Sequence, residues 1–284
     1  MGPRSSPSSS PRRPMTTSRP SSSRTEARVP GSVARGPAVT LPSWAPHGAA
    51  LRDFLAGDTD AAVVVRGEDG EEERTAARVF FRDREEFSAL DEAALDLCRG
   101  RVLDVGAGAG CHSLVLQARG VPVTALDVSP EAVEVMRRRG VADARCGDIF
   151  SFGGERFDTL LILMNGIGLV GTLDGLSRFL RDVRRLVADG GQILLDSFDP
   201  GQAENALPGR YVGEMRFQLE YRGIRGSFYD FVFLDFGTLR GRAAAAGWRC
   251  ESIWQEDEGH YLARLTCGEA ATDGTGESEA PACE

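Results

Sequence analysis

Three glycines and two aspartates near the middle of the chain have the types and spacing needed to bind a nucleoside-containing molecule. Gly106, Gly108 and Gly110 alternate shortly after Asp104, and Asp127 follows later in the chain. Glycine has no side chain and tolerates left-handed backbone angles, so its N–H groups can approach a ligand closely. A carboxylate can accept hydrogen bonds from two hydroxyl groups at once, as a ribose requires. The pattern indicates a site for a nucleotide-type cofactor.

The elements on either side must position these residues. Asp104 belongs to the apolar segment 102–105, and Asp127 ends the apolar segment 121–127. Short apolar runs of this kind are typical of strands buried on both faces of a sheet. A helix-like segment, 112–119, follows the three glycines. A strand, a glycine turn and a helix in this order place backbone N–H groups and a helix N-terminus against a ligand.

Strands and helices continue to alternate through the centre of the chain. Ser88, with Asp91 three residues later, predicts the start of one helix, and Ser129 followed by proline predicts another that ends at Gly140. The remaining segments are a short strand ahead of Gly147, a strand at 157–164, a helix at 176–187 and a strand at 192–197. This alternation predicts a parallel sheet covered by helices on both faces.

The pattern changes after residue 199. Apolar and polar residues alternate over 211–221, which predicts a half-exposed antiparallel strand that pairs with 228–234. We expect this hairpin to be an insertion over the open end of the sheet, with its aromatic residues either in the core or lining a substrate site. A helix at 238–246 and strands at 250–255 and 260–266 complete the domain. Because the turn between those two strands is short, the last strand must be antiparallel to its neighbour.

The N-terminal part predicts a small cap on this domain. A helix is expected at 49–55, and strands at 61–66 and 78–82 are expected to pair around the acidic turn 67–70. We therefore expect a folded domain at 46–267 between two disordered tails, one rich in Ser, Pro and Arg at 1–45 and one acidic at 268–284. Within the folded domain, we expect an N-terminal cap at 46–100 and a hairpin insertion at 200–235.

Composition narrows the function further. The net charge is −9, with seven arginines against one glutamate in the N-terminal tail, so the folded part is acidic and lacks the basic surface of a nucleic-acid binder. No apolar run approaches the length of a membrane span. The six cysteines form no C-x-x-C pair and only three histidines are present, so we expect no metal site. These features favour a cytoplasmic protein with reduced thiols.

The spacing of the glycines distinguishes between possible cofactors. A dinucleotide fold needs G-x-G-x-x-G, but Cys111 stands where its third glycine would be. The pattern D-x-G-x-G-x-G, with an acid closing the next strand, instead resembles the class I S-adenosylmethionine-dependent methyltransferases. The resemblance covers 80–267. It implies an α/β, Rossmann-like three-layer sandwich with a seven-stranded, mostly parallel sheet of order 3-2-1-4-5-7-6, in which strand 7 is antiparallel.

The resemblance also implies roles for individual residues around S-adenosyl-L-methionine. Asp104 would help hold the amino group, and Asp127 would accept the ribose hydroxyls. Val128 would lie against the adenine, with Asp148 accepting from its amino group and the backbone of Ile149 donating to the ring. The full set of implied cofactor contacts is Asp104, Gly106, Ala107, Gly108, Gly110, Asp127, Val128, Asp148, Ile149, Met164 and Asn165.

Several of these residues could instead have a structural role. Asp127 could cap the turn before Ser129, and Asp148 could be a turn residue. His112 lies in a first helical turn, where the helix N-terminus disfavours its charged form, so we expect a local hydrogen-bonding role rather than a base. Arg82 could reach a carboxylate of cofactor or substrate, or could be solvated. The candidate substrate contacts are Phe81, Arg82 and His112, and the candidate catalytic residues are Asn165, Asp199 and Tyr211.

The acceptor is expected to be a small molecule, with neither nucleic acid nor membrane as partner. The segment after the fourth predicted strand reads Met-Asn-Gly-Ile-Gly and lacks the Asn/Asp-Pro-Pro-Tyr run expected of enzymes that methylate amino groups of nucleic acids or proteins. Two other functions compete with methyl transfer. One is a nicotinamide-dependent oxidoreductase, which Cys111 disfavours, and the other is a non-catalytic relative that only binds the cofactor.

Overall fold

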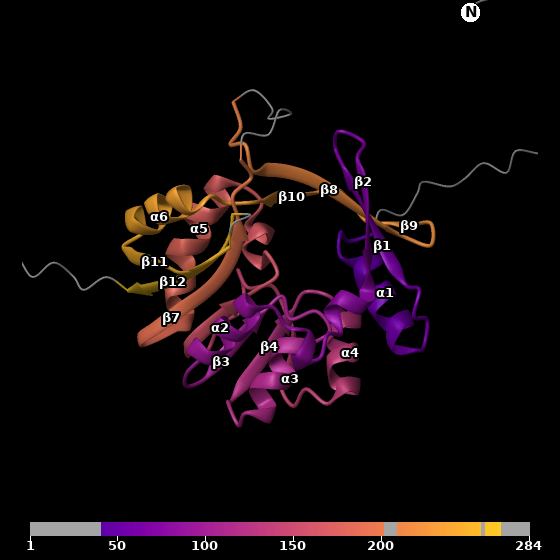
Figure 1. Ribbon diagram of the computed structural model, residues 1–284, viewed down its shortest axis with the longest axis horizontal. Coiled ribbons are helices and arrows are strands. Elements are labelled where there is room, and N and C mark those ends of the chain that lie inside the picture. The colour runs from indigo at the N-terminus through magenta and orange to yellow at the C-terminus, as the bar shows by residue number, and fades with distance from the viewer. Residues whose placement is uncertain (1–40, 202–208, 257–258, 268–284) are drawn as a thin grey trace, which may run out of the picture. The chain divides into compact units, whose positions relative to one another are not determined.

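A computed structural model describes residues 41–201, 209–256 and 259–267 (Figure 1). The predicted tails lie outside the described residues, except that 41–45 are described. Leu41 forms a parallel bridge with Gly226, so backbone pairing begins before the predicted end of the N-terminal tail. No helix in the described part of the chain has the length and apolar character needed to cross a lipid bilayer.

The larger of two sheets has seven strands in the order β11-β12-β7-β6-β3-β4-β5. Strands β3 to β7 pair in parallel, and β12 runs antiparallel to both β7 and β11. This confirms the predicted order with its antiparallel seventh strand. The strands are β3 (Val102–Val105), β4 (Val123–Asp127), β5 (Ala144–Cys146), β6 (Phe157–Ile162), β7 (Val187–Phe198), β11 (Trp248–Gln255) and β12 (His260–Cys267).

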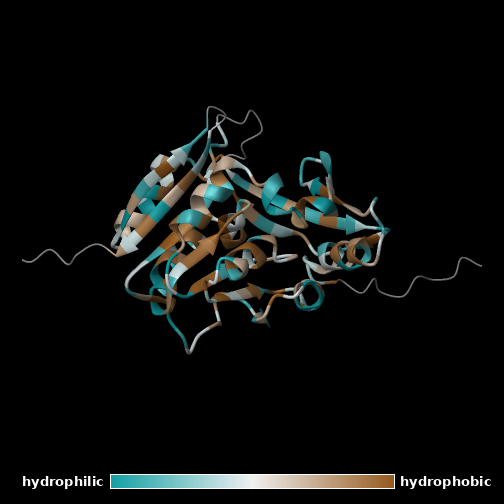
Figure 2. Cartoon of the chain, turned by 60° about the horizontal axis from the view of Figure 1, so that its bottom comes forward, coloured by the Kyte–Doolittle hydropathy of each residue, from teal (hydrophilic) through white to brown (hydrophobic). Residues whose placement is uncertain are grey.

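Helices cover both faces of this sheet, giving the predicted three layers. One face packs on α2 (Ala89–Leu97), α3 (Cys111–Ala118) and α4 (Pro130–Arg139), and the other on α5 (Leu173–Asp182) and α6 (Phe236–Ala245). Hydrophobic residues gather on the central strands and on the helix surfaces turned toward them (Figure 2). The alternation is visible along β7, where Leu194 packs toward α2 while Ile193 and Leu195 pack toward α5.

The helix boundaries follow the local signals. Ser129 caps α4 by accepting a hydrogen bond from the backbone of Ala132, and Gly140 ends that helix with a φ of 97°. Ser88 and Asp91 form a capping box at the start of α2. Both starts agree with the predictions, because a capping side chain and the backbone it satisfies are only three residues apart.

The smaller sheet joins two parts of the chain that are far apart in sequence. Its order is β10-β8-β1-β2, with β9 beside β8 (Figure 1). The strands are β1 (Ala62–Gly67), β2 (Glu72–Ala76), β8 (Glu214–Tyr221), β9 (Ile224–Arg225) and β10 (Tyr229–Val232). The inserted hairpin therefore pairs with the N-terminal cap, through β1 and β8. The predicted hairpin is present, but its partner in the cap was not predicted.

The predicted pairing of 61–66 with 78–82 is wrong. The chain reverses directly after Gly70, which has a φ of 88°, so the partner strand is β2. The backbone of Ala77 then donates to Ala61 and closes the hairpin, and the following residues form a 3₁₀ helix, η1 (Ala77–Phe80). The other 3₁₀ helices are η2 (Arg84–Glu86), η3 (Gly166–Val170) and η4 (Val183–Leu186).

The cap rests on the start of α4. Helix α1 (Ala45–Leu55) begins earlier than predicted and approaches α4 closely at Gly48. A Cβ atom on Gly48 would lie 2.5 Å from Ser129 Oγ and 2.9 Å from Glu131 Cβ, so a larger residue there would push the two helices apart. The cap is thereby held beside the carboxyl ends of β3 and β4, where the predicted site lies.

Candidate functional site

The glycine turn between β3 and α3 is tied to the end of β4. The backbone N–H groups of Gly106 and Ala107 donate to the carbonyl of Leu126, at 2.8 and 3.1 Å. The next N–H, of Gly108, donates to Asp127 Oδ2 at 2.9 Å. Gly106, Gly108 and Gly110 all have left-handed φ angles, of 71°, 55° and 79°. Residues with a side chain rarely adopt these angles, so the turn depends on glycine.

The three glycines have different surroundings. A Cβ atom on Gly106 would meet only Leu169 Cδ1, at 3.6 Å, and one on Gly108 would come nearest to Phe80 Cδ1, at 3.9 Å. A Cβ atom on Gly110 would lie 2.9 Å from Val141 Cγ2 and 3.0 Å from the side chain of Met136. Gly106 and Gly108 thus leave room for a ligand, whereas the bare side of Gly110 is filled by α4 and the loop after it.

Asp127 stands where the turn meets α4. Its Oδ1 accepts a hydrogen bond from the backbone of Ser129 at 2.8 Å, and its Oδ2 accepts the one from Gly108. The side chain therefore has the local turn role considered as an alternative. Each carboxylate oxygen has a second lone pair, so two hydroxyl groups of a ligand can still bind. The neighbouring Val128 is exposed.

The cap places His47 and Phe80 over this turn, and neither was predicted. The His47 ring packs edge-on against Phe80 with 4.5 Å between centroids. Its Nε2 is buried and has no hydrogen-bond partner among the described residues. Burial lowers the pKa of His47, with Asp127 acting in the opposite direction, so the ring is neutral. The sequence offered no signal for His47, because only tertiary packing brings α1 to this place.

Asp104 is buried on the face of the sheet that packs against α2 and α3. Its Oδ2 accepts a hydrogen bond of 2.6 Å from the hydroxyl of Ser113. Burial raises the pKa of Asp104, and the nearby His112 acts in the opposite direction. The protein thus provides a hydrogen-bonded carboxylate that lacks a salt-bridge partner among the described residues.

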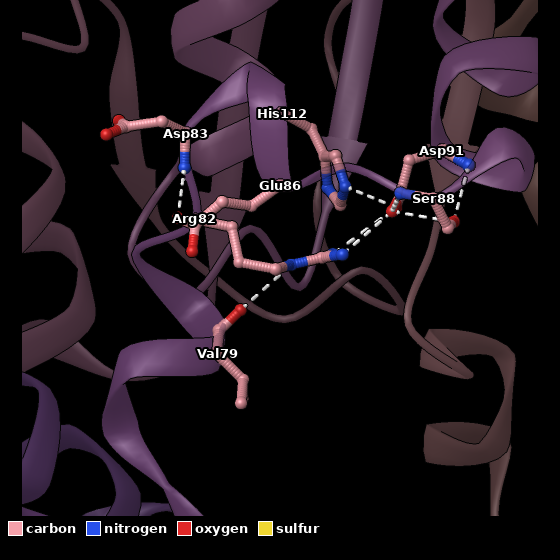
Figure 3. Close-up of polar contacts among 7 residues, drawn as sticks. All are labelled: Val79, Arg82, Asp83, Glu86, Ser88, Asp91 and His112. Carbon is pink, nitrogen blue, oxygen red and sulfur yellow. Dashed lines mark hydrogen bonds and ion pairs between the residues drawn. The ribbon is translucent and has the colours of Figure 1, made fainter.

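Arg82 and His112 converge on the carboxylate of Asp91 (Figure 3). His112 Nε2 lies 2.9 Å from Asp91 Oδ1, and Arg82 Nη1 lies 2.8 Å from Asp91 Oδ2. The backbone and hydroxyl of Ser88 also donate to Oδ2, both at 2.9 Å. Burial lowers the pKa of His112, but the hydrogen bond to Asp91, together with the contributions of Cys111 and Asp104, raises it to about 10.

Two predictions about this network need correction. His112 has the local hydrogen-bonding role that was predicted. The helix N-terminus was expected to disfavour its charged form, but the buried carboxylate of Asp91 favours the imidazolium. Arg82 was expected to be solvated or to reach a carboxylate of a ligand, but it forms an ion pair inside the protein. Both errors have one cause: the sequence indicated Asp91 only as part of a helix cap, and its other partners come from the loop after η1 and from α3.

Asp196, at the end of β7, is a buried carboxylate that the sequence reading missed. Its Oδ1 accepts a hydrogen bond of 2.9 Å from the backbone of Asn165. Burial raises the pKa of Asp196 to about 7, although that hydrogen bond lowers it. An acid inside the apolar run 193–198 was the available signal.

Met164 and Asn165 have left-handed φ angles of 60° and 57°, an unusual strain for two consecutive residues with side chains. Met164 is exposed beside the site. The side-chain Oδ1 of Asn165 is buried without a partner among the described residues. Strained residues and unpaired buried atoms of this kind gather at functional sites.

The other predicted site residues are held in local structure. Asp148 Oδ1 accepts from the backbone of Phe150 at 2.9 Å, and Asp199 Oδ1, on an exposed residue, accepts from Gly201 at 2.8 Å. The Ile149 carbonyl accepts from Arg185 at 2.8 Å.

The side chains of Tyr211 and Phe81 also make contacts within the protein. The hydroxyl of Tyr211 donates to Asp235 Oδ2 at 2.6 Å, and burial together with this contact raises its pKa to about 12. Phe81 lies against Phe54, with 4.5 Å between ring centroids, and under the guanidinium of Arg139. These contacts explain both side chains as structural.

Comparisons with known proteins agree with this geometry. A family model described as a methyltransferase domain matches residues 103–195. The crystal structure of an S-adenosylmethionine-dependent methyltransferase from Bacteroides fragilis, in complex with S-adenosyl-L-homocysteine, is 38% identical to this chain. The match covers 81% of this chain and 98% of the Bacteroides fragilis chain, with a TM-score of 0.74.

Two curated relatives match over a shorter region. The ubiquinone biosynthesis O-methyltransferase of Xanthomonas oryzae pv. oryzae is 31% identical over 123 residues, which are 40% of this chain and 50% of that protein. The demethylmenaquinone methyltransferase of Clavibacter sepedonicus is 31% identical over 116 residues, which are 39% of this chain and 46% of that protein. This chain therefore spans about half the length of the curated relatives it matches.

Proposed function

The chain belongs to the class I S-adenosylmethionine-dependent methyltransferases, and from this premise we propose that it transfers a methyl group from S-adenosyl-L-methionine to a small-molecule acceptor by in-line displacement. One observation carries the proposal. The space left by Gly106 and Gly108 lies at the end of β3, the strand that also carries the buried carboxylate of Asp104.

The buried charges of the site suit this cofactor. Asp104 and Asp196 are both within electrostatic reach of His112, and burial raises the pKa of each carboxylate. Burying carboxylates without enough positive charge costs free energy, which a cationic ligand offsets. S-adenosyl-L-methionine carries an ammonium group and a sulfonium, and when bound it supplies the activated methyl group. The Oδ1 of Asn165, which has no hydrogen-bond partner within the described ranges, is an additional acceptor on this side of the site.

The other end of the site suits a nucleoside. Asp127, held by Gly108 and Ser129, would accept the two ribose hydroxyls with its remaining lone pairs. The exposed side chain of Val128 would lie against the adenine. Asp148 would accept from the adenine amino group, and the backbone of Ile149 would donate to the ring. Gly110 has a packing role in this arrangement rather than a direct contact.

The residues of the chain mainly have to align the reactants and exclude water. In-line methyl transfer gains up to about 7–11 kcal/mol from correct positioning alone. Phe80 and His47 from the cap, and Leu169 from η3, border the turn and would enclose the reacting groups. The proposal assigns no general base.

A small-molecule acceptor is favoured by the acidic composition and by the curated relatives, whose names refer to ubiquinone biosynthesis and to demethylmenaquinone. A cytoplasmic location and the absence of nucleic-acid and membrane partners stay predictions from the sequence. A non-catalytic cofactor binder is the main alternative function.

The test combines binding and turnover on the full chain. Calorimetry with S-adenosyl-L-homocysteine should show binding, and NAD should not bind. Incubation of S-adenosyl-L-methionine carrying a labelled methyl group with a metabolite extract should give products that have gained one labelled methyl group. Cofactor binding without any labelled product would favour the binder, and tight NAD binding without binding of S-adenosyl-L-homocysteine would overturn the proposal.

A further inference from the structure

A continuous set of aromatic rings lies between the smaller sheet and the end of β7. We call this set the aromatic wall, and it consists of Phe198, Phe217, Tyr229, Phe231 and Phe233. Neighbouring ring centroids are 4.4 Å apart for Phe198–Phe233, 5.0 Å for Phe231–Phe233, 5.9 Å for Phe217–Phe231 and 6.3 Å for Phe217–Tyr229. These spacings are those of interacting aromatic pairs.

The aromatic wall is not part of the core. All five side chains are only partly buried, and none belongs to the buried clusters of the described core. Large aromatic side chains left partly accessible in one contiguous group mark a binding surface more often than a packing accident. Of the two sequence-based interpretations of the hairpin aromatics, this favours the substrate wall.

The strand register shows which way the wall faces. Phe217 pairs with Tyr229 across β8 and β10, and Phe231 pairs with Met215, so these side chains share one face of the sheet. Leu219, two residues further along β8, packs on the cluster that includes α1. This face is therefore the one that packs on α1, and the alternate residues Arg216 and Asp230 form an ion pair on the opposite face.

The aromatic wall and the glycine turn both border η3. The ring of Phe231 occupies the position that a side chain on Gly168 would need, so the wall rests directly on η3. The next residue, Leu169, is 56% exposed and reaches within 3.6 Å of where a Cβ atom on Gly106 would lie. The aromatic wall and the glycine turn thus border neighbouring residues of η3.

We propose that the aromatic wall binds the methyl acceptor, and that this acceptor is a planar aromatic molecule bearing a hydroxyl group. The inference rests on the proposed methyltransferase function and names its substrate class. Four of the five rings are phenylalanines, which offer stacking surface but no hydrogen bonds. The phenol of Tyr229 is the polar group of the wall, and burial raises its pKa to about 12, so it stays protonated and can donate a hydrogen bond.

The test uses 2-naphthol as a probe and the full chain saturated with S-adenosyl-L-homocysteine. Calorimetry should show 2-naphthol binding, and Phe217→Leu and Phe231→Leu should each weaken it about three- to tenfold, the range expected for losing one aromatic pair. Phe228→Leu is the matched control, because Phe228 is 43% exposed, stacks under Arg216 and lies outside the wall. All three variants should bind S-adenosyl-L-homocysteine as the wild type does.

The outcomes separate the two proposals. Failure of the wild-type chain to bind S-adenosyl-L-homocysteine would count against the methyltransferase function itself. If that ligand binds but 2-naphthol does not bind at millimolar concentration, or the wall variants match Phe228→Leu, the aromatic wall is not the acceptor site. If glucosamine binds instead and the wall variants weaken it, the site exists but the aromatic substrate class is wrong. Thermal melting of each variant establishes that loss of binding is not loss of the fold.

Discussion

His112 Nε2 lies 2.9 Å from Asp91 Oδ1, and both side chains are buried between α2 and α3. Arg82 completes the group by pairing with the other carboxylate oxygen. The loop that carries Arg82, the helix α2 and the helix α3 after the glycine turn are thus joined through one carboxylate. This arrangement fixes the start of α3, on which the position of the glycine turn depends.

The Asp91–His112 pair should make stability depend on pH. Burial alone would raise the pKa of Asp91, but the hydrogen bonds from His112 and Arg82 hold it well below its ordinary range. The pair's contribution is therefore lost when the pH falls below about 4, the pKa of an unfolded Asp, and when it rises from about 6.5 toward the folded value of His112, about 10. Asp91→Asn should lower the free energy of unfolding by about 3 kcal/mol at pH 6 and by less at pH 10.

Urea unfolding at both pH values measures this difference. Asp96→Asn is the control on the same helix, because Asp96 is largely exposed and its pair with Arg119 is worth little. Equal losses of stability at pH 6 and pH 10 for Asp91→Asn would contradict the assignment of a protonated His112.

Substitutions of two glycines in the turn should distinguish an effect on ligand binding from an effect on packing. Gly108→Ala should weaken binding of S-adenosyl-L-homocysteine, because its methyl group would enter the open space, and should cost about 1–2 kcal/mol of stability from backbone strain. Gly110→Ala should cost about 2–4 kcal/mol, because its methyl group would also clash with Val141 and Met136. Calorimetry and thermal melting measure the two effects.

Gly120→Ala is the control for strain. Gly120 has a φ of 77° and nothing within 4 Å of an added Cβ atom, so the substitution should destabilise without changing affinity. If Gly108→Ala binds S-adenosyl-L-homocysteine as tightly as this control does, the glycine turn is not part of the binding site.

Asp127→Ala should weaken binding of S-adenosyl-L-homocysteine by roughly a hundredfold or more, the effect of losing two hydrogen bonds to a charged group. The variant should also be less stable, since the backbone N–H groups of Gly108 and Ser129 lose their acceptor. Affinity must be measured below the melting temperature of the variant. Asp69→Ala is the comparison, because Asp69 also accepts a backbone hydrogen bond within a turn, from Glu71, and has no role in the proposed site. Equal losses in both variants would argue against the ribose role of Asp127.

Asp196→Asn should stabilise the free protein at high pH. Because burial raises the pKa of Asp196 from about 4 to about 7, the folded state loses stability relative to the unfolded state as the pH rises through this window. The neutral amide can still accept from the backbone of Asn165, so the variant should be more stable than the wild type at pH 8, on the order of 2–4 kcal/mol, and similar at pH 4.

The same variant should bind S-adenosyl-L-methionine about tenfold more weakly, since it has lost a charge that would face the cationic ligand. Asp199→Asn, on an exposed residue just past the same strand, should change neither property. If Asp196→Asn binds S-adenosyl-L-methionine as tightly as the wild type does, the Asp196 carboxylate does not contact the cofactor.

Much of the architecture could be predicted because it depends on short stretches of sequence. A capping box spans three residues, a buried strand is a run of apolar side chains, and a short turn requires antiparallel strands. These signals were enough for the alternation of strands and helices, the antiparallel last strand and the position of the glycine turn, whereas the seven-strand order was implied by the resemblance to the methyltransferase family. They also predicted the inserted hairpin, although not its other neighbour.

The remaining features depend on segments that meet only in the folded protein. The pairing of β1 with β8, the packing of His47 over the turn, the ion pairs of Asp91 and the burial of Asp196 each join residues that no local pattern relates. Even within the glycine motif, spacing alone could not distinguish a ligand-facing glycine from a packed one. Gly110 continues the spacing of Gly106, but its bare side is filled by Met136 and Val141. The sequence by itself determined the alternation of strands and helices that makes a parallel sheet, and where a cofactor can approach the backbone. Only the tertiary structure decided which charges are paired and which rings face the site, because burial and partner choice are set by packing between distant segments.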